Sequence, residues 1–198
     1  MRENFNRAER ERMSKMIKFG TGGWRAIISD EFTRQNIGLL CQSLSILMKN
    51  NKADKIVIGY DRRFLSDKGA VWAAEVFAAN EINVLLIPKN APTPLIMFAV
   101  NKYGCKYGMA ITASHNPADY NGIKIFTEGG RDAALDITDK IESIANESPK
   151  VLSIEFEEGK KSGIIKDIFP FNDYIDGILE MIDTEAIRKA RLNILLDP

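Results

Sequence analysis

A serine, a histidine, an asparagine and a proline follow one another at positions 114–117. This is the stretch of the chain whose side chains could most readily take part in a reaction. The hydroxyl of Ser114 could act as a nucleophile, and His115, the only histidine in the sequence, could act as its base. Lys124 follows further along the chain. Acyl hydrolysis and phosphoryl transfer both use a serine in this way, and the neighbouring residues help to discriminate between them.

The spacing argues against a serine hydrolase. Neighbouring residues of an extended backbone point to opposite sides, so we expect His115 to reach the Ser114 hydroxyl poorly. The G-x-S-x-G nucleophile elbow is also absent. Phosphoryl transfer needs aligned oxygens, together with cationic and amide groups that balance the phosphoryl charge. We therefore favour phosphoryl transfer.

A lysine could supply such a charge. Pro117 stiffens the end of the serine segment, and the Asn-Gly pair at 121–122 predicts a turn that returns the chain toward Ser114. Lys124 then lies on the returning strand, on the face opposite to its two isoleucine neighbours. The alternative for Lys124 is an ordinary solvated lysine.

The segment GTGGWR, residues 20–25, could also contact phosphate. Its glycines, Gly22 among them, can present backbone N–H groups, Thr21 adds a hydroxyl, and Arg25 offers a two-pronged guanidinium. The segment is neither a P-loop nor a G-x-G-x-x-G motif, so a simple tight turn is the alternative.

A third polar segment, GYDRRF at 59–64, follows an apolar run. It brings together one carboxylate, Asp61, and two guanidiniums, Arg62 and Arg63. Ion pairs that order a loop and direct participation in catalysis are both open interpretations.

Composition excludes several classes of function. The 27 basic and 27 acidic residues cancel, so no net charge attracts the chain to nucleic acid or to anionic lipid. One histidine and two cysteines without metal-ligand spacing make a zinc site improbable, and we expect Cys41 and Cys105 to be buried thiols. With no long apolar run and no apolar region near the N-terminus, we expect a cytoplasmic protein that does not enter a membrane.

Apolar periodicity predicts alternating helices and strands. Helices are expected at 33–48, with Thr33 as N-cap, from residue 66 or 67 to 81, at 93–104, at 132–146 and at 171–190. Strands are expected at 55–61, 82–88, 107–114, 122–127 and 191–198.

This order predicts an α/β fold: three α/β/α layers around a mixed, mostly parallel sheet with one antiparallel strand. Asp61 and Ser114 then fall at strand carboxyl ends, where such sheets bind ligands. We expect a charged extension at 1–17, a first domain at 18–165, and an incomplete second α/β domain at 166–198, because a lone final strand cannot form a sheet. That strand could instead join the first sheet or a partner chain.

Three motifs together carry a resemblance. TASHNP followed by DYNGIK is similar to the phosphoserine loop of the α-D-phosphohexomutases, the phosphoglucomutase and phosphomannomutase superfamily. FGTGGWR and GYDRR stand in the order and at the spacing of that family's first domain. The resemblance extends from about Lys18 to Gly130, and the tail is similar to the start of a second domain.

The resemblance implies roles for the matching residues. Ser114 would carry a phosphoryl group and exchange it with a hexose phosphate through a hexose 1,6-bisphosphate. His115 and Lys124 would lie near the transferring group, and Lys124 would transfer a proton or stabilise charge. Arg25 would contact the phosphoserine region, and Asn116 would order the loop. Thr21, Gly22 and Arg63 would belong to the phosphate-binding surroundings.

The resemblance also implies Mg²⁺, bound in part through the phosphate on Ser114. The aspartate-rich DGDGDR-type loop that supplies the family's other magnesium ligands does not occur in this sequence, nor do the sugar- and phosphate-binding loops of the later domains. GTGGWR also continues with alanine where many relatives have glycine.

We therefore expect the N-terminal, serine-bearing domain of a phosphohexomutase, inactive when alone, whose substrate is a hexose phosphate. Exposed apolar residues between 171 and 196 predict a homodimer formed through the tail. The alternative is a non-catalytic module that binds a sugar phosphate or a partner protein.

Overall fold

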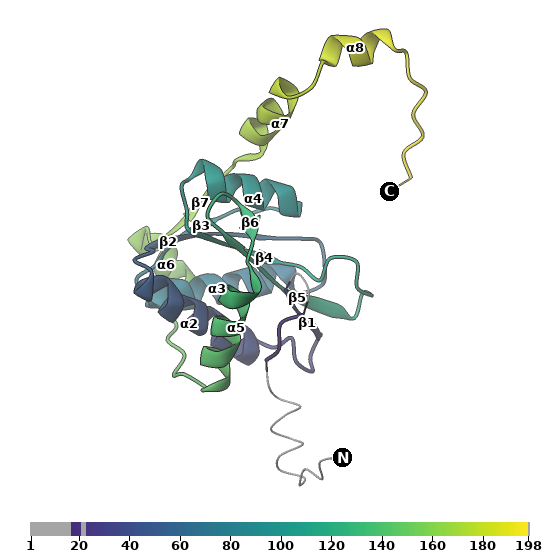
Figure 1. Ribbon diagram of the computed structural model, residues 1–198. Helices are drawn as coiled ribbons and strands as arrows, with labels where there is room; N and C mark the ends of the chain where they lie inside the picture. The colour runs from purple at the N-terminus through teal and green to yellow at the C-terminus, as the bar shows by residue number, and fades with distance from the viewer. Residues whose placement is uncertain (1–16, 21–22, 198) are drawn as a thin grey trace. The chain divides into compact units, whose positions relative to one another are not determined.

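The fold is taken from a computed structural model, in which residues 17–20 and 23–197 are described (Figure 1). Of the charged extension expected at 1–17, only Ile17 lies among these residues. Ile17 is buried; its N–H donates to Asn146 Oδ1 and the Asn146 amide donates back to its carbonyl, each at 3.1 Å. Ile17 thus belongs to the packed domain, not to the extension where we had placed it.

The chain divides into two compact units, the first ending at Ile168 and the second beginning at Phe169. We had expected the division after residue 165. The sheet of the first unit extends further because its last strand, Ile165–Asp167, pairs in parallel with Asn83–Leu86.

The first unit is built on a seven-stranded sheet. Its strands are β1 (Trp24–Ile27), β2 (Lys55–Tyr60), β3 (Asn83–Leu86), β4 (Tyr107–Ile111), β5 (Tyr120–Thr127), β6 (Arg131–Asp132) and β7 (Ile165–Asp167). The order is β1-β5-β4-β2-β3-β7, with β6 paired to β5. Among these strands β5 alone runs against the others, since β1, β4 and β6 are all antiparallel to it and β2, β3, β4 and β7 form parallel pairs. The predicted mixed, mostly parallel sheet is confirmed.

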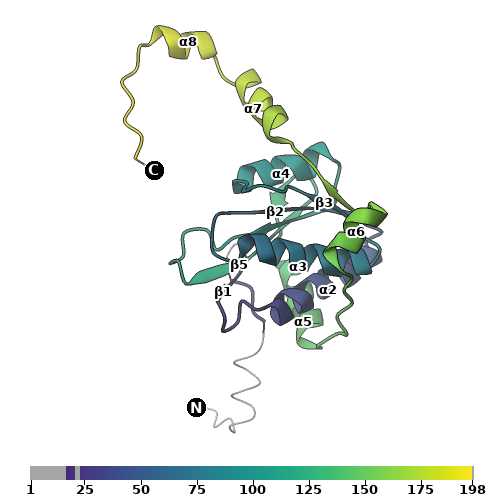
Figure 2. The ribbon, with the colours of Figure 1, turned by 180° about the vertical axis from the view of Figure 1, so that it is seen from behind.

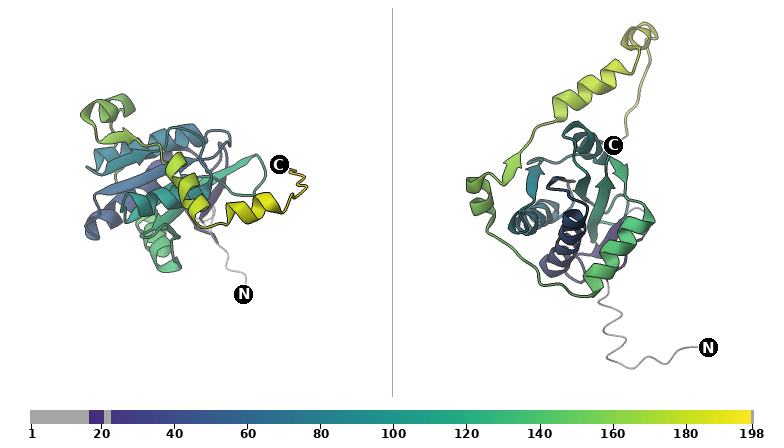
Figure 3. Two further views of the ribbon diagram at one scale, coloured as in Figure 1. Left: turned by 90° about the horizontal axis from the view of Figure 1, so that it is seen from above. Right: turned by 60° about the vertical axis from the view of Figure 1, so that its left-hand side comes forward.

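Helices cover both faces of this sheet. They are α2 (Arg34–Asn50), α3 (Ser66–Ala79), α4 (Thr93–Lys102), α5 (Leu135–Asn146) and α6 (Phe156–Ser162). In Figure 1 and in the reverse view of Figure 2, α4 lies on one side of the strands and α2, α3 and α5 lie on the other. The right-hand view of Figure 3 shows the same arrangement. The predicted three-layer α/β/α fold is therefore confirmed.

Local signals explain where several elements begin and end. The Thr33 side chain accepts a hydrogen bond from the Asn36 N–H at 3.2 Å and caps α2, as predicted. Pro94 stands in the first turn of α4, where its missing N–H costs nothing, and Gly104 follows that helix with φ +58°. The central strands β2 and β4 are buried, as expected of strands covered on both faces.

One expected turn is wrong. Asn121 and Gly122 lie inside β5, paired with Ala26 and Arg25 of β1, and not in a turn. The chain reverses before them, where the Tyr120 N–H donates to the Pro117 carbonyl at 3.1 Å. Gly122 is required because a Cβ there would lie 2.2 Å from the Trp24 carbonyl oxygen.

The second unit holds α7 (Phe171–Glu180) and α8 (Thr184–Lys189). The single helix expected at 171–190 is thus two helices, with Asp183 capping the second through Ala186 N–H at 2.9 Å. The strand expected at 191–198 does not form over Leu192–Asp197. A strand needs a neighbour for its backbone hydrogen bonds, and this apolar run has none among the described residues.

Candidate functional site

Ser114 lies on an exposed loop that begins where β4 ends. Its backbone is left-handed, with φ +56°, which is uncommon for a residue other than glycine. The conformation is held from one side by Thr112, whose buried hydroxyl accepts the Ser114 N–H at 2.9 Å. The loop therefore presents the serine in one defined backbone geometry.

The left-handed turn brings Ser114 Oγ to 3.4 Å from His115 Nδ1. Our expectation that adjacency would keep the two side chains apart is wrong, because it assumed an extended backbone. Among the described residues, however, no carboxylate contacts His115, so the arrangement lacks the third group that orients the base of a hydrolase triad.

Arg63 holds the serine loop together. Its Nη1 donates to the Pro117 carbonyl at 2.7 Å and to the Tyr120 carbonyl at 3.0 Å. Its Nη2 donates to the Ser114 carbonyl at 2.9 Å and to the Asn116 carbonyl. Of the two interpretations left open for this segment, these contacts are those of a residue that orders a loop.

Asp61 and the start of α3 fix Arg63 in turn. Asp61 Oδ1 accepts the Arg63 backbone N–H at 2.9 Å and the Ser66 hydroxyl at 2.7 Å, and Asp61 Oδ2 lies 3.6 Å from Arg63 Nε. The Asn121 amide donates to Ser66 Oγ and to the Phe64 carbonyl, both at 2.9 Å. The network therefore links the ends of β2 and β4, the start of α3 and the first residues of β5.

Arg25 reaches the same loop from β1. Its Nη1 donates to Asn116 Oδ1 at 2.9 Å, so Asn116 is held by Arg25 through its side chain and by Arg63 through its carbonyl. Gly23, which precedes the strand, packs so closely on β5 that a Cβ would lie 2.6 Å from the Ile123 carbonyl oxygen. Thr21 and Gly22, predicted for phosphate contact, lie outside the described residues.

Lys124 forms an ion pair with Asp132, at 3.2 Å between Nζ and Oδ1. Trp24 and Ala26 of β1 belong to the hydrophobic core, and so do the two isoleucines that flank Lys124. Since side chains alternate along strands, Arg25 and Lys124 share the opposite face of the sheet. Arg25 pairs with Gly122, which places Lys124 one diagonal step away.

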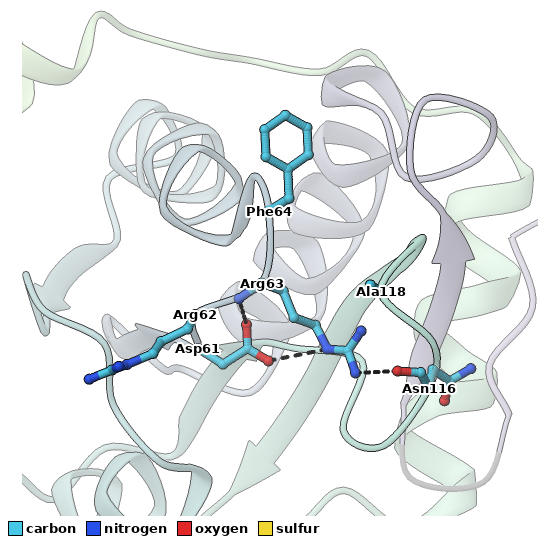
Figure 4. Close-up of a pocket in the computed structure, with 6 residues that line it drawn as sticks. All are labelled: Asp61, Arg62, Arg63, Phe64, Asn116 and Ala118. Atoms are coloured by element: carbon cyan, nitrogen blue, oxygen red, sulfur yellow. Dashed lines mark hydrogen bonds and ion pairs between the residues drawn. The ribbon is translucent and has the colours of Figure 1, made fainter.

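The surface beside the loop is an open depression of about 530 Å³, drawn in Figure 4. Asp61, Arg63, Phe64 and Asn116 line it, with Arg62 and Ala118. Figure 4 shows the Arg63 guanidinium extending toward Asn116, while the Arg62 side chain points away from the loop. Phe64 is 71% exposed at the rim.

Within the described residues no three His, Cys, Asp or Glu side chains group closely enough to hold a metal ion. None of the helices described is long and apolar enough to cross a membrane. Both cysteines are buried and free, as predicted.

The structure therefore brings together Ser114, His115, Asn116, Arg25 and Arg63, and places Lys124 on a neighbouring strand face. Sequence reasoning missed Thr112, Ser66 and Asn121 as parts of the site. Ser66 gave the signal of a helix start, and Asn121 gave that of a turn; neither signal reveals the hydrogen bonds that these side chains make.

Fold and site together define a class of protein: a three-layer α/β/α domain that presents a serine on an ordered loop after a central strand. Residues 16–151 match the family described as phosphoglucomutase/phosphomannomutase, alpha/beta/alpha domain I. The chain belongs to this family.

Relatives agree with this assignment. The chain is 30% identical over 183 residues to the phosphoglucosamine/phosphogalactosamine mutase of Sulfurisphaera tokodaii, covering 91% of this chain and 38% of that protein. It is 32% identical over 183 residues to a phosphoglucomutase of Staphylococcus aureus, covering 88% and 33%. The chain thus spans a third to two fifths of the length of these relatives.

Solved structures show the same fold. A phosphomannomutase-type protein of Thermus thermophilus superimposes with a TM-score of 0.77 at 29% identity, covering 86% of this chain and 37% of that one. The phosphoprotein pp63/parafusin of Paramecium, a phosphoglucomutase in an open form, superimposes with a TM-score of 0.74 at 20% identity, covering 86% and 37%, and supports the fold alone.

Proposed function

We propose that this chain is the serine-bearing domain of a phosphohexomutase, an enzyme that interconverts hexose 1-phosphate and hexose 6-phosphate. Ser114 carries the phosphoryl group in this proposal, and the intermediate is a hexose 1,6-bisphosphate. The observation that supports it best is the serine loop itself: an exposed hydroxyl at a strand end, on a loop whose backbone is bound by Arg63 and whose Asn116 side chain is bound by Arg25, in a domain of this family.

The proposed transfer exchanges one phosphorus–oxygen bond for another. A hydroxyl oxygen of the sugar attacks the phosphorus on Ser114, the bond from phosphorus to Ser114 Oγ breaks, and the sugar proton ends on Ser114 Oγ. His115 Nδ1, 3.4 Å from that oxygen, is in reach to relay the proton. Rephosphorylation of the serine by the other phosphate of the intermediate reverses these steps.

We propose that two cations, Arg25 and Lys124, balance the charge of the phosphoryl group. The Arg25 guanidinium uses one N–H group on Asn116 and has others to offer a phosphate oxygen. Lys124 lies on the same face of the sheet, and its ammonium group pairs with Asp132 in this structure. We assign both a charge-balancing role.

Magnesium fits this chain only in part. Mg²⁺ requires near-octahedral coordination by hard oxygen ligands, and the described residues contain no cluster of carboxylates that would supply them. A phosphate on Ser114 would offer one oxygen. We therefore propose that this chain contributes no more than that ligand, and that by itself it does not turn over hexose phosphate.

Peptide mapping of the purified protein tests the proposal. We expect a phosphoryl group on the peptide that contains Ser114, in a fraction of the molecules, and its absence from the Ser114→Ala variant. Phosphorylation at another serine, with none at Ser114 in any preparation, would contradict the proposed role.

A further inference from the structure

Arg63 is enclosed by the backbone of the serine loop. Four carbonyl oxygens, those of residues 114, 116, 117 and 120, accept the four N–H hydrogens of its two Nη atoms. The remaining donor, Nε, faces Asp61 Oδ2 at 3.6 Å. Four of the five guanidinium donors therefore have hydrogen-bond partners within the loop, and the fifth faces a carboxylate.

This geometry suits arginine and no other side chain. The loop curves so that carbonyl groups separated by up to six residues converge on one point, where each needs a donor. A guanidinium offers five donors in a rigid plane, whereas a lysine ammonium offers three on a flexible stem. Lysine at position 63 would leave carbonyl groups of the loop without partners.

The guanidinium is itself fixed in place. Asp61 binds both the backbone N–H and the Nε side of Arg63, and Ser66 at the start of α3 binds Asp61. Only 16% of the Arg63 side chain is exposed. The position of the loop is therefore set by the rigid elements β2 and α3.

We infer that Arg63 is a positioning residue for the phosphoryl transfer proposed above, acting on the backbone of the loop and not on the substrate. One of its hydrogen bonds is to the carbonyl of Ser114, while Thr112 binds the N–H of the same residue. The two contacts fix both peptide groups of Ser114 in the left-handed conformation and so set the direction of its Cα–Cβ bond, from which the hydroxyl extends. The inference takes from the proposed function only the identity of the reaction, phosphoryl transfer; the ordering of the loop by Arg63 rests on the contacts alone.

Arg62 provides a matched control. It has the same side chain one residue earlier, is exposed, and points away from the loop in Figure 4. Removal of the Arg62 guanidinium changes the charge of the depression as much as removal of the Arg63 guanidinium does. Only the Arg63 change removes the hydrogen bonds to the loop.

Hydrogen exchange on the 198-residue chain tests the positioning itself. In Arg63→Ala we expect the amides of Ser114, Asn116 and Tyr120, each hydrogen-bonded within the loop, to exchange at least about tenfold faster. Arg63→Lys should lie between wild type and Arg63→Ala, and Arg62→Ala should match wild type. Amides of the buried strands β2 and β4 should keep their wild-type exchange rates in every variant.

The outcomes separate a local effect from a loss of fold. Unchanged loop exchange in both Arg63 variants would overturn the inference, and so would equal acceleration in β2 and β4, which would mean that Arg63 stabilises the whole domain. If Arg63→Ala does not fold, the exchange rates of the loop and strand amides are compared between Arg63→Lys and Arg62→Ala instead.

Phosphoryl uptake by Ser114 from glucose 1,6-bisphosphate adds a readout of the reaction. We expect at least about a tenfold slower uptake in Arg63→Lys than in Arg62→Ala. Equal uptake in these two variants would overturn the positioning role. If wild type takes up nothing while the exchange pattern holds, the proposed function fails and the structural part of the inference stands.

Discussion

Single residues of this domain divide into those that present chemistry and those that hold it in place. Ser114 and His115 stand at the surface, and their geometry depends on a buried hydroxyl at Thr112 and a largely buried guanidinium at Arg63. The reactive residues gave the clearest sequence signal. Arg63 also stood out, with loop ordering as one of two interpretations, but Thr112 gave no signal, because its role is a hydrogen bond to a backbone N–H, which almost every residue has.

A residue-scale prediction concerns Cys105. Burial, with a smaller contribution from Asp54 and against the effect of Lys55, raises the pKa of the Cys105 thiol to about 11 from an ordinary value of 9.0. The folded state then holds the thiol proton more tightly than the unfolded state, so the free energy of unfolding should fall as the pH rises from about 9 to about 11.

Urea denaturation at a series of pH values measures this effect, with Cys105→Ala as the control. In Cys105→Ala the free energy of unfolding should fall less steeply between about pH 9 and pH 11 than in the wild-type protein. An identical pH dependence in the two proteins would count against the burial effect.

At the scale of helices and strands, local sequence patterns predicted the structure best. Helices α2 to α5, strands β2 to β5, the single antiparallel strand and the capping of α2 by Thr33 follow from local patterns, whereas β1, β6, β7 and α6 were not predicted. Two patterns misled. The Asn-Gly pair at 121–122 reads locally as a turn, yet the close approach of β1 requires the glycine and the network around Ser66 uses the asparagine. The apolar run at 192–197 reads as a strand but has no strand beside it.

An element-scale prediction follows from the contact between β1 and β5. In Gly122→Ala the new methyl group would meet the Trp24 carbonyl oxygen at 2.2 Å and the Thr112 carbonyl oxygen at 3.1 Å, and neither backbone can move without disturbing the sheet. We expect a loss of about 1–3 kcal/mol in the free energy of unfolding, measured by urea denaturation.

Gly20→Ala is the matched control. Among the described residues, the atom nearest to a Cβ at position 20 is the Gly23 carbonyl oxygen at 3.8 Å, an ordinary contact distance. Equal stability of the two variants would show that β1 and β5 do not approach as closely as described.

At the scale of the whole molecule, the two compact units differ in how they bury apolar side chains. The first encloses a continuous core, whereas α7 exposes Phe171, Ile175 and Leu179 at helical spacing. Exposed apolar stripes of this kind associate with a partner surface. For the 198-residue chain, a second copy is the partner that we expect.

Sedimentation velocity at rising concentration tests this expectation. The 198-residue chain should form dimers, and a chain that ends at Ile168 should remain monomeric with the fold of the first unit unchanged. A chain that stays monomeric at high concentration, or a shortened chain that still dimerises, would contradict the role of the second unit.

The absence of a metal-ligand cluster among the described residues also has a consequence at this scale. With glucose 1-phosphate, Mg²⁺ and catalytic glucose 1,6-bisphosphate, we expect no sustained formation of glucose 6-phosphate by the chain alone. Turnover near the roughly 10 s⁻¹ typical of enzymes would show that the 198-residue chain suffices for the reaction.

Phosphoryl uptake followed by intact-protein mass spectrometry tests the central claim most directly. The wild-type chain is incubated with glucose 1,6-bisphosphate and Mg²⁺, and its mass is compared over time with that of Ser114→Ala treated in the same way. We predict the gain of one phosphoryl group by the wild-type chain, located at Ser114, and no gain by the variant. Equal uptake by the two proteins, or no uptake by either, would contradict the role of Ser114 as the phosphoryl carrier.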